Sequence, residues 1–206
     1  MQNNMPGSSW KSIFRKGFER KYVELVLYSY KEVLNMKPCD KPWEDTRRNM
    51  LLDQMRKNKG LFGITFHIGS EEGVFDENYR DNGRIDICCY LSQLEDDYIA
   101  FECKRFLKED IIPSYIRDAY YGEGIKRFED NIYADKVDFG GMIAFLEEGD
   151  YQKLWQRLVQ ELPRYTSDGN VCDISNTYGY QYILQTRHDR KFGGDIVLIH
   201  ILMDFT

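Results

Sequence analysis

Two carboxylates and one lysine stand out within the most apolar part of the sequence. Asp86 lies in the run of residues 83–90, and Glu102 and Lys104 lie near the end of the run of residues 98–105. Many of the other residues in both runs are β-branched, aromatic or cysteine, which is typical of buried strands. Ionised groups are costly to bury unless they are paired or bind a metal. The chemistry of this trio therefore depends on what offsets its charge.

Strand geometry can bring the three side chains together. Glu102 and Lys104 are two residues apart, so they point to the same face of a strand. Asp86 comes from the preceding strand and can lie beside them if the two strands pair through the polar residues between them. The pattern predicts a hairpin of residues 84–90 and 98–104, central in its sheet and covered on both faces.

Two interpretations of the trio remain open at this point. In the first, Lys104 forms a structural ion pair with Glu102 or Asp86. In the second, Asp86, Glu102 and the carbonyl of Cys103 offer oxygen ligands suited to Mg²⁺. Lys104 could then orient or deprotonate a water and stabilise the charge that develops on a phosphate.

A family resemblance is carried by two short segments, Ile85-Asp86 and Phe101-Glu102-Cys103-Lys104. This arrangement resembles the PD-(D/E)XK nuclease superfamily, whose members share the restriction-endonuclease-like fold. The resemblance covers roughly residues 44–146 by the order of the expected elements, and its motif is only a few residues long. Isoleucine stands here where the pattern has proline before the aspartate, and this change leaves the expected metal ligand in place.

The resemblance implies roles for individual residues of this chain. Asp86 and Glu102 would hold Mg²⁺, or Mn²⁺, and Lys104 would position the attacking water. In this superfamily an acidic residue of the first core helix often reaches the active site, and Glu44 or Asp45 matches it by position. Acidic residues also stabilise a helix N-terminus, which is an equally good explanation for both.

Four basic residues are candidates for contacts with nucleic-acid phosphates: Arg105, Lys126, Arg127 and Lys136. The last three lie within or just after a helix expected over residues 113–131. Gly122 and Gly124 also fall inside this helix, each about 1 kcal/mol less favourable there than alanine. Close approach to another backbone or to substrate would explain the glycines, and so would a break between two shorter helices.

The remaining pattern predicts one α/β domain over residues 1–206, and the resemblance implies a restriction-endonuclease-like mixed sheet flanked by helices. Its expected parts are an N-terminal helical extension, a core, and a C-terminal helix with an antiparallel hairpin that extends the sheet (1–42, 43–146 and 147–206). Apolar spacing predicts further helices and strands over defined ranges. The helices are expected at 10–34, 43–58 and 151–162, and the strands at 63–68, 140–146, 180–187 and 196–205.

Two polar stretches, residues 69–83 and 165–176, are expected to be loops. The first is long for a connection beside a candidate site. Its charged residues could contact metal or substrate: Glu71, Glu72, Asp76, Glu77 and Arg80. His188, in the turn of the C-terminal hairpin, could likewise contact substrate, although solvation of such loop residues is the more common explanation.

Composition limits the classes of function. The net charge of −6 argues against a protein that coats nucleic acid through bulk electrostatics, but a metal-loaded acidic site ringed by a few cations can still receive phosphate. The 5 cysteines include no CxxC pair, so we expect reduced thiols rather than disulfides or a zinc site. We find no apolar run of membrane-spanning length and no leader pattern, so we expect a cytoplasmic protein without a membrane partner.

The sequence therefore predicts a Mg²⁺-dependent nuclease that hydrolyses phosphodiester bonds, with DNA as substrate by analogy with the superfamily. A partner protein for targeting, a homodimer, and a place in a prokaryotic defence or mobile-element system would all suit such a chain. One alternative is a catalytically silent, nuclease-like binding or assembly subunit of a larger complex. Another is an unrelated α/β protein in which the trio is a structural ion pair.

Overall fold

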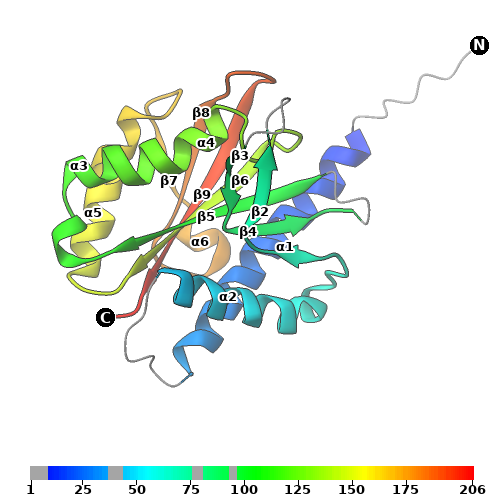
Figure 1. Cartoon of the computed structure of the whole chain (residues 1–206), viewed down its shortest axis with the longest axis horizontal. Coiled ribbons are helices and arrows are strands. Elements are labelled where there is room, and N and C mark those ends of the chain that lie inside the picture. The colour runs from blue at the N-terminus through cyan, green and yellow to red at the C-terminus, as the bar shows by residue number, and fades with distance from the viewer. Residues whose placement is uncertain (1–8, 37–43, 76–80, 93–96) are drawn as a thin grey trace, which may run out of the picture.

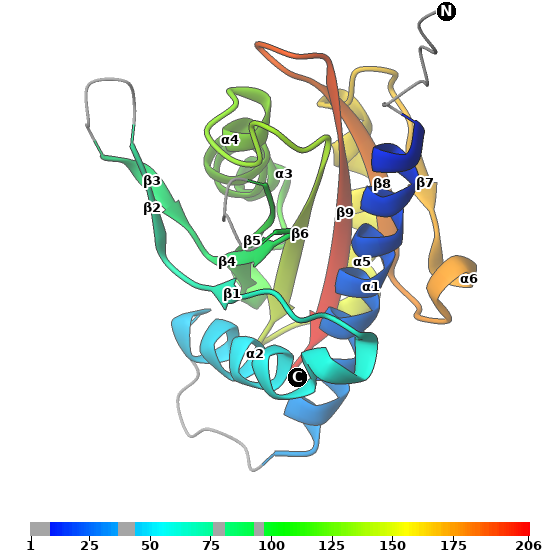
Figure 2. The ribbon, with the colours of Figure 1, turned by 90° about the vertical axis from the view of Figure 1, so that its right-hand side faces the viewer.

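A mixed sheet runs through the middle of the molecule, with helices on both faces (Figures 1 and 2). The computed structural model describes residues 9–36, 44–75, 81–92 and 97–206, and within them seven strands form this sheet in the order β1-β4-β5-β6-β9-β8-β7. The α/β class and the mixed sheet expected from the sequence are confirmed. The strands are β1 (Ile68–Gly69), β4 (Ile87–Tyr90), β5 (Tyr98–Phe106), β6 (Phe139–Leu146), β7 (Val171–Asp173), β8 (Ile183–Asp189) and β9 (Asp195–Asp204).

The strand pairings confirm both expected hairpins. β4 and β5 are antiparallel, with Ile87 opposite Phe101 and Tyr90 opposite Tyr98, and β8 and β9 are also antiparallel. β6 pairs in parallel with β5 on one side and with β9 on the other. The first hairpin, expected to be central in the sheet, lies near one edge, because only the short β1 lies beyond β4. The middle position belongs to β6, whose eight residues are all buried.

Helices cover the two faces of the sheet separately. α1 (Ser9–Leu34) lies on one face, where the Tyr30 hydroxyl donates to the carbonyl of Asp204 at 2.7 Å, and it packs against α2 (Glu44–Asn58). The other face carries α5 and a continuous helical run over residues 113–129, and in Figure 2 the blue α1 passes in front of the yellow α5. The run comprises α3 (Pro113–Tyr115), the π-helix η3 (Ile116–Ile125) and α4 (Lys126–Glu129), and α5 spans Tyr151–Glu161. These helices match the expected ones closely, although Trp43 lies outside the described residues.

The strand expected over residues 63–68 is mostly absent. The preceding residues form a 3₁₀ turn, η1 (Lys59–Phe62), which ends at Gly63 in the left-handed conformation with φ 64°. Only Ile68 and Gly69 pair, with Cys89 and Cys88. Alternation of apolar and polar residues predicts this strand, and residues 64–68 do alternate in burial, but alternation alone does not supply a strand partner.

The long loop expected over residues 69–83 is instead largely an antiparallel ribbon. β2 (Glu72–Phe75) pairs with β3 (Asp81–Ile85) apart from the main sheet, and the ribbon projects from the body in Figure 2. Asp86 lies at the bend where the chain leaves β3 and enters β4, so the strand expected over residues 84–90 is interrupted there. Aspartate disfavours strands. The other charged candidates of this loop, Asp76, Glu77 and Arg80, lie outside the described residues.

The C-terminal region departs from expectation in two places. The loop expected over residues 165–176 contains β7, which pairs with β8, and the short helix α6 (Ser175–Tyr178). His188 is a fully buried residue of β8 rather than part of a solvated turn. Its Nε2 and the Nε2 of His200 both contact the hydroxyl of Thr186, at 2.8 and 2.6 Å. This network satisfies polar groups in the core.

We predict that Gly141→Ala destabilises the protein by about 1–3 kcal/mol, because overpacking a filled core costs that much. A methyl group at Gly141 would overlap the ring of Phe101, which is fully buried between strands and helices. Urea unfolding would measure the change. Gly17→Ala in α1 is the matched control, since no described atom other than its chain neighbours and the helix backbone lies within 4 Å of its added methyl, and it should stabilise the helix by up to about 1 kcal/mol. Equal effects of the two substitutions would contradict the packing.

Candidate active site

Glu102 is the most deeply buried acidic group of the expected trio. It lies in β5 and is 2% exposed. Its Oε1 accepts a hydrogen bond from Lys104 Nζ at 2.8 Å and lies 4.0 Å from Arg127 Nη1. Its Oε2 is buried and has no hydrogen-bond partner among the described residues. One oxygen of a buried carboxylate is therefore satisfied and the other is open.

The surroundings of Glu102 raise the pKa of its carboxyl group. Burial raises the pKa of this carboxyl to about 7, with the positive charge of Lys104 opposing the shift and the negative charge of Asp86 adding to it. Arg127 opposes the shift as well. Asp86, Glu102 and Lys104 therefore interact as one cluster, as the sequence predicts.

Asp86 is held by two donors from different parts of the chain. Its Oδ2 accepts from the backbone nitrogen of Cys103 at 2.7 Å, and its Oδ1 accepts from Arg48 Nη1 at 3.0 Å. The first bond attaches the bend at Asp86 to β5, next to Glu102. The Cys103 amide thus positions Asp86, while the role expected for the Cys103 carbonyl as a metal ligand stays a prediction.

Arg48 is the residue of this cluster that the sequence analysis missed. Its side chain is 6% exposed, and it contacts three carboxylates: Asp86 at 3.0 Å, Asp45 at 3.2 Å and Glu71 at 3.2 Å. Glu71 adopts a left-handed backbone conformation with φ 54°. The sequence contains only indirect evidence for Arg48. Buried carboxylates need a counter-charge, and α2 has arginines one turn after the acidic residues at its N-terminus.

The two acidic candidates of α2 have different outcomes. Asp45 is mostly exposed and reaches the cluster through Arg48. Glu44 is the first residue of α2, and its side chain lies outside the described part of the structure. A direct role for either residue stays a prediction.

Of the four expected phosphate contacts, the structure brings Arg127 to the cluster. Its guanidinium donates to the hydroxyl of Tyr133, which in turn donates to the carbonyl of Arg84. Tyr133 and Gly83 line this contact, since a Cβ at Gly83 would lie 3.3 Å from Arg127 Nη1. The arginine is thereby fixed between β3 and the helical run.

The other three cations are not brought to Glu102. Lys126 pairs with Asp130 one turn along the helix and is 42% exposed, and Lys136 lies on the surface beyond the helical run. Arg105 alternates with Lys104 along β5, so its side chain starts toward the opposite face of the sheet. The described contacts therefore give these three no place beside the carboxylates.

Gly124 allows the helical run to approach β5 closely. A Cβ there would lie 2.5 Å from Met142 Cε and 3.5 Å from Lys104 Cε. The glycine therefore accommodates side chains of the sheet, rather than marking a helix break. The wider π-helix turn continues through Gly122 and Gly124, and such segments often occur at functional sites.

Comparison of the chain with protein-family models, with curated proteins and with solved structures finds no match. Within the described residues, no helix has the length and apolar character needed to cross a membrane. The same residues contain no group of three or more His, Cys, Asp or Glu side chains that could hold a metal ion. The resemblance to the nuclease superfamily thus rests on the motif and stays a prediction.

We predict that Glu102 makes stability depend on pH. Because burial raises its pKa from 4.5 to about 7, the folded state is favoured most below pH 4.5 and loses this advantage as pH rises through 7. The linked loss is about 3 kcal/mol. Glu102→Gln removes the ionising group, so the variant should not lose this stability. As the pH rises from 4.5 through 7, the variant should therefore gain in free energy of unfolding relative to the wild type.

Urea unfolding between pH 4.5 and 8 would test this dependence. Glu123→Gln removes an exposed glutamate of the neighbouring helical run and should keep the slope of the wild type. An unchanged slope in Glu102→Gln would show that Glu102 ionises normally in the folded protein.

Proposed function

We propose that this chain is a metal-dependent nuclease of the PD-(D/E)XK type, which hydrolyses phosphodiester bonds of nucleic acid. The observation that carries the proposal is the buried carboxylate of Glu102, which has one oxygen bonded to Lys104 and the other without a partner among the described residues, beside Asp86. A purely structural ion pair would be expected to satisfy both oxygens, because leaving one buried and unpaired is costly. The oxygen without a partner among the described residues favours a cation-binding site over a structural ion pair.

The residues present suit Mg²⁺ or Mn²⁺. Mg²⁺ is commonly bound by one or two carboxylates together with waters and substrate phosphates, rather than by a complete cage of protein ligands. Asp86 and Glu102 would supply the carboxylates, with the Cys103 carbonyl as a further oxygen. When bound, such an ion lowers the pKa of water and polarises the phosphate.

Lys104 has the position required to assist this chemistry. Its ammonium is 2.8 Å from Glu102 Oε1, and its side chain is only 13% exposed. Packing beneath Gly124 limits its movement. A preorganised cation at this point orients a water and stabilises the negative charge that develops on phosphorus-bound oxygens.

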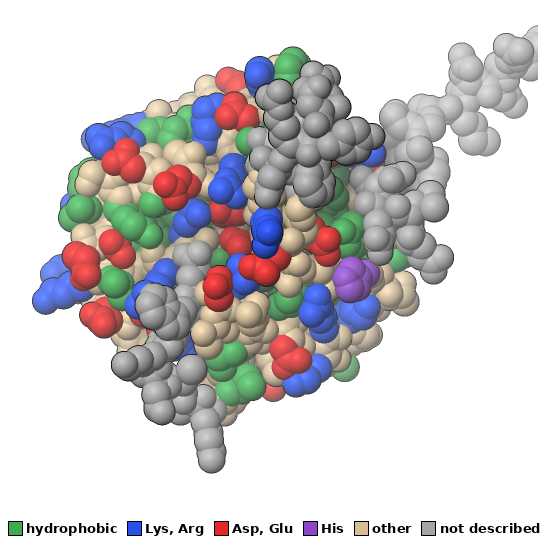
Figure 3. Space-filling view, viewed as in Figure 1, with side chains coloured by type: hydrophobic (Ala, Val, Ile, Leu, Met, Phe, Trp, Pro, Cys, Tyr) green, Lys and Arg blue, Asp and Glu red, His purple; other side chains and the backbone are tan. Residues whose placement is uncertain are grey.

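Arg127 is the cation best placed to hold the substrate phosphate. Tyr133 fixes its guanidinium, and its side chain remains 32% exposed. Guanidinium groups bind phosphate oxygens in a forked geometry. On the face seen in Figure 3, basic and acidic side chains are interspersed, so local contacts of this kind, rather than a broad basic surface, would receive the strand.

Arg48 acts in this proposal as a positioning residue. It bonds to Asp86 and keeps the carboxylates of Asp45 and Glu71 nearby. Its positive charge would also repel a divalent cation bound to Asp86. Arg48 would therefore orient Asp86 while setting how tightly the metal binds.

A second candidate is a nuclease-like subunit that binds or assembles without turnover, although the presence of all three charges counts against it. The ion pair between Lys104 and Glu102 would suit an unrelated α/β protein in which the trio is structural. DNA as the nucleic acid, a partner protein, a homodimer, the cytoplasmic location and the defence context all stay predictions. Activity separates the two candidates.

Cleavage of single- and double-stranded DNA and RNA in Mg²⁺ or Mn²⁺ would test the proposal. Asp86→Ala should abolish cleavage because a metal ligand is lost. Lys104→Gln should slow single-turnover cleavage by roughly two orders of magnitude, the usual effect of removing one preorganised stabilising group. Arg127→Gln should weaken substrate binding and its salt dependence more than Lys126→Gln, since Lys126 is paired with Asp130 on the surface.

Two results would contradict this account of the site. Cleavage by Lys104→Gln at the wild-type rate, with saturating substrate and metal, would remove the lysine from the mechanism. Binding of nucleic acid without cleavage under any of these conditions would favour the silent subunit.

A further inference from the structure

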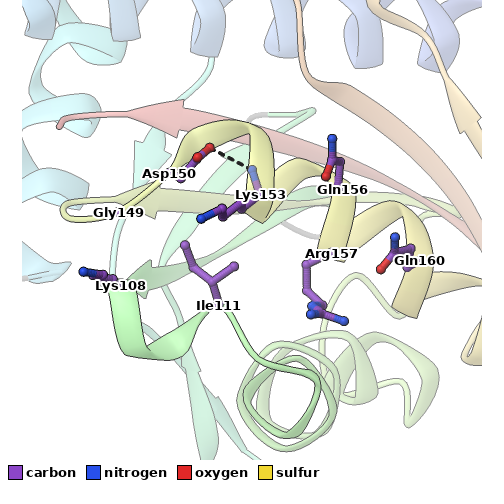
Figure 4. Close-up of a pocket in the computed structure, with 8 residues that line it drawn as sticks. All are labelled: Lys108, Ile111, Gly149, Asp150, Lys153, Gln156, Arg157 and Gln160. Atoms are coloured by element: carbon purple, nitrogen blue, oxygen red, sulfur yellow. Dashed lines mark hydrogen bonds between the residues drawn. The ribbon is translucent and has the colours of Figure 1, made fainter.

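A groove separate from the carboxylate cluster lies between α5 and the segment that follows β5 (Figure 4). Its volume is about 580 Å³, which is within the usual range for small-molecule sites. None of the residues that line it belongs to the site around Glu102. Its polar lining comprises Lys108, Asp150, Lys153, Gln156, Arg157 and Gln160.

The sheet topology creates this groove. β5 and β6 are parallel, so the segments that follow them meet at the same edge of the sheet. Lys108 begins the 3₁₀ turn η2 (Lys108–Asp110) after β5, and Gly149 and Asp150 connect β6 to α5. Gly149 adopts φ 118°, and a Cβ there would lie 3.2 Å from Lys108 Cα, so the two segments are in contact. Crevices at the carboxyl ends of parallel strands are where α/β proteins commonly bind ligands.

The groove is locally positive on a chain whose net charge is −6. Three cations line it against a single carboxylate. Among the described residues, Lys108 and Lys153 have no ion-pair partner, and Arg157 Nη1 lies 3.6 Å from Glu161 Oε1. In Figure 4, Lys153 and Arg157 extend from α5 on the side of the segment that carries Ile111.

The single carboxylate is already committed to the backbone. Asp150 is the N-cap of α5, and its Oδ1 accepts from the backbone nitrogen of Lys153 at 3.0 Å. It therefore offsets the cations only in part. The N-terminal end of α5 adds its own partial positive charge to this side of the groove.

We propose that this groove binds a phosphate ester of about the size of a mononucleotide. The phosphate would lie among Lys108, Lys153 and Arg157, because charge-assisted bonds from these groups are the strongest available there. The amides of Gln156 and Gln160 offer both donors and acceptors to the polar part of the ligand, and Ile111 offers an apolar wall. A free mononucleotide and a phosphate of a nucleic-acid strand share this chemistry.

Calorimetric titration without divalent metal would test the groove independently of the proposed nuclease activity. The probes are inorganic phosphate, a nucleoside 5′-monophosphate, and a dinucleoside monophosphate that contains only the internal diester. We expect the monophosphate to bind at one site per chain. Lys153→Gln and Lys108→Gln should each weaken this binding by about tenfold, the value of one charge-assisted hydrogen bond.

Two further variants test the effect of the Asp150 charge and the location of the binding site. Asp150→Asn keeps an N-cap residue but removes the negative charge, so it should tighten binding by about two- to threefold. Lys31→Gln removes an exposed lysine from α1, on the opposite face of the sheet, and should leave the dissociation constant unchanged.

The probes also identify the source of the phosphate. Equal affinity for the diester and the monoester would assign the groove to a nucleic-acid strand, and preference for the monoester would assign it to a small ligand. The proposal is overturned if no probe binds saturably, or if Lys153→Gln and Lys31→Gln change the affinity equally.

Discussion

The burial of the Glu102 carboxylate in β5 is the constraint on which the rest of this site depends. An ionised carboxylate without compensation would be destabilised by several kcal/mol in such surroundings. Lys104 and Arg127 offset the charge at one oxygen, at 2.8 and 4.0 Å, while the other oxygen has no partner among the described residues. Compensation is thus incomplete, and a pKa near 7 is the result.

Several features of the fold serve to bring those cations within reach. The helical run of residues 113–129 carries Arg127, and Gly124 lets that run approach the side chain of Lys104. Tyr133 holds Arg127 against the ribbon strand β3. On the outer side, Arg48 of α2 holds Asp86. Four separate parts of the chain therefore converge on the pair β4–β5.

The sequence predicted the parts of this arrangement that follow local rules. Period-two alternation in apolar strands placed Glu102 and Lys104 on one face, and the hairpin brought Asp86 beside them. Arg48 could not be found in this way, because it lies 38 residues from Asp86 and no local pattern joins the two. Lys126 lies apart from the carboxylates, paired with Asp130 four residues away and 42% exposed, and its contact with phosphate stays a prediction.

The errors in the fold have a similar origin. The ribbon β2–β3 is rich in polar and glycine residues, so nothing in its composition distinguishes it from a loop. β7 is short and lies at the edge of the sheet, where pairing with β8 rather than burial defines the strand. The strand expected over residues 63–68 was inferred from alternation, which residues 64–67 retain in their burial although they form no strand.

The central claim, that Asp86 and Glu102 form a cation site, is tested most directly by diffraction from crystals soaked in Mn²⁺ above pH 7, where Glu102 is ionised. The account predicts an anomalous peak bonded to a carboxylate oxygen of Asp86 and to Oε2 of Glu102, with Lys104 still in contact with Glu102. The absence of a peak there at saturating Mn²⁺, with the pairs of Arg48 with Asp86 and Lys104 with Glu102 unchanged, would contradict it. The trio would then be a structural ion-pair cluster.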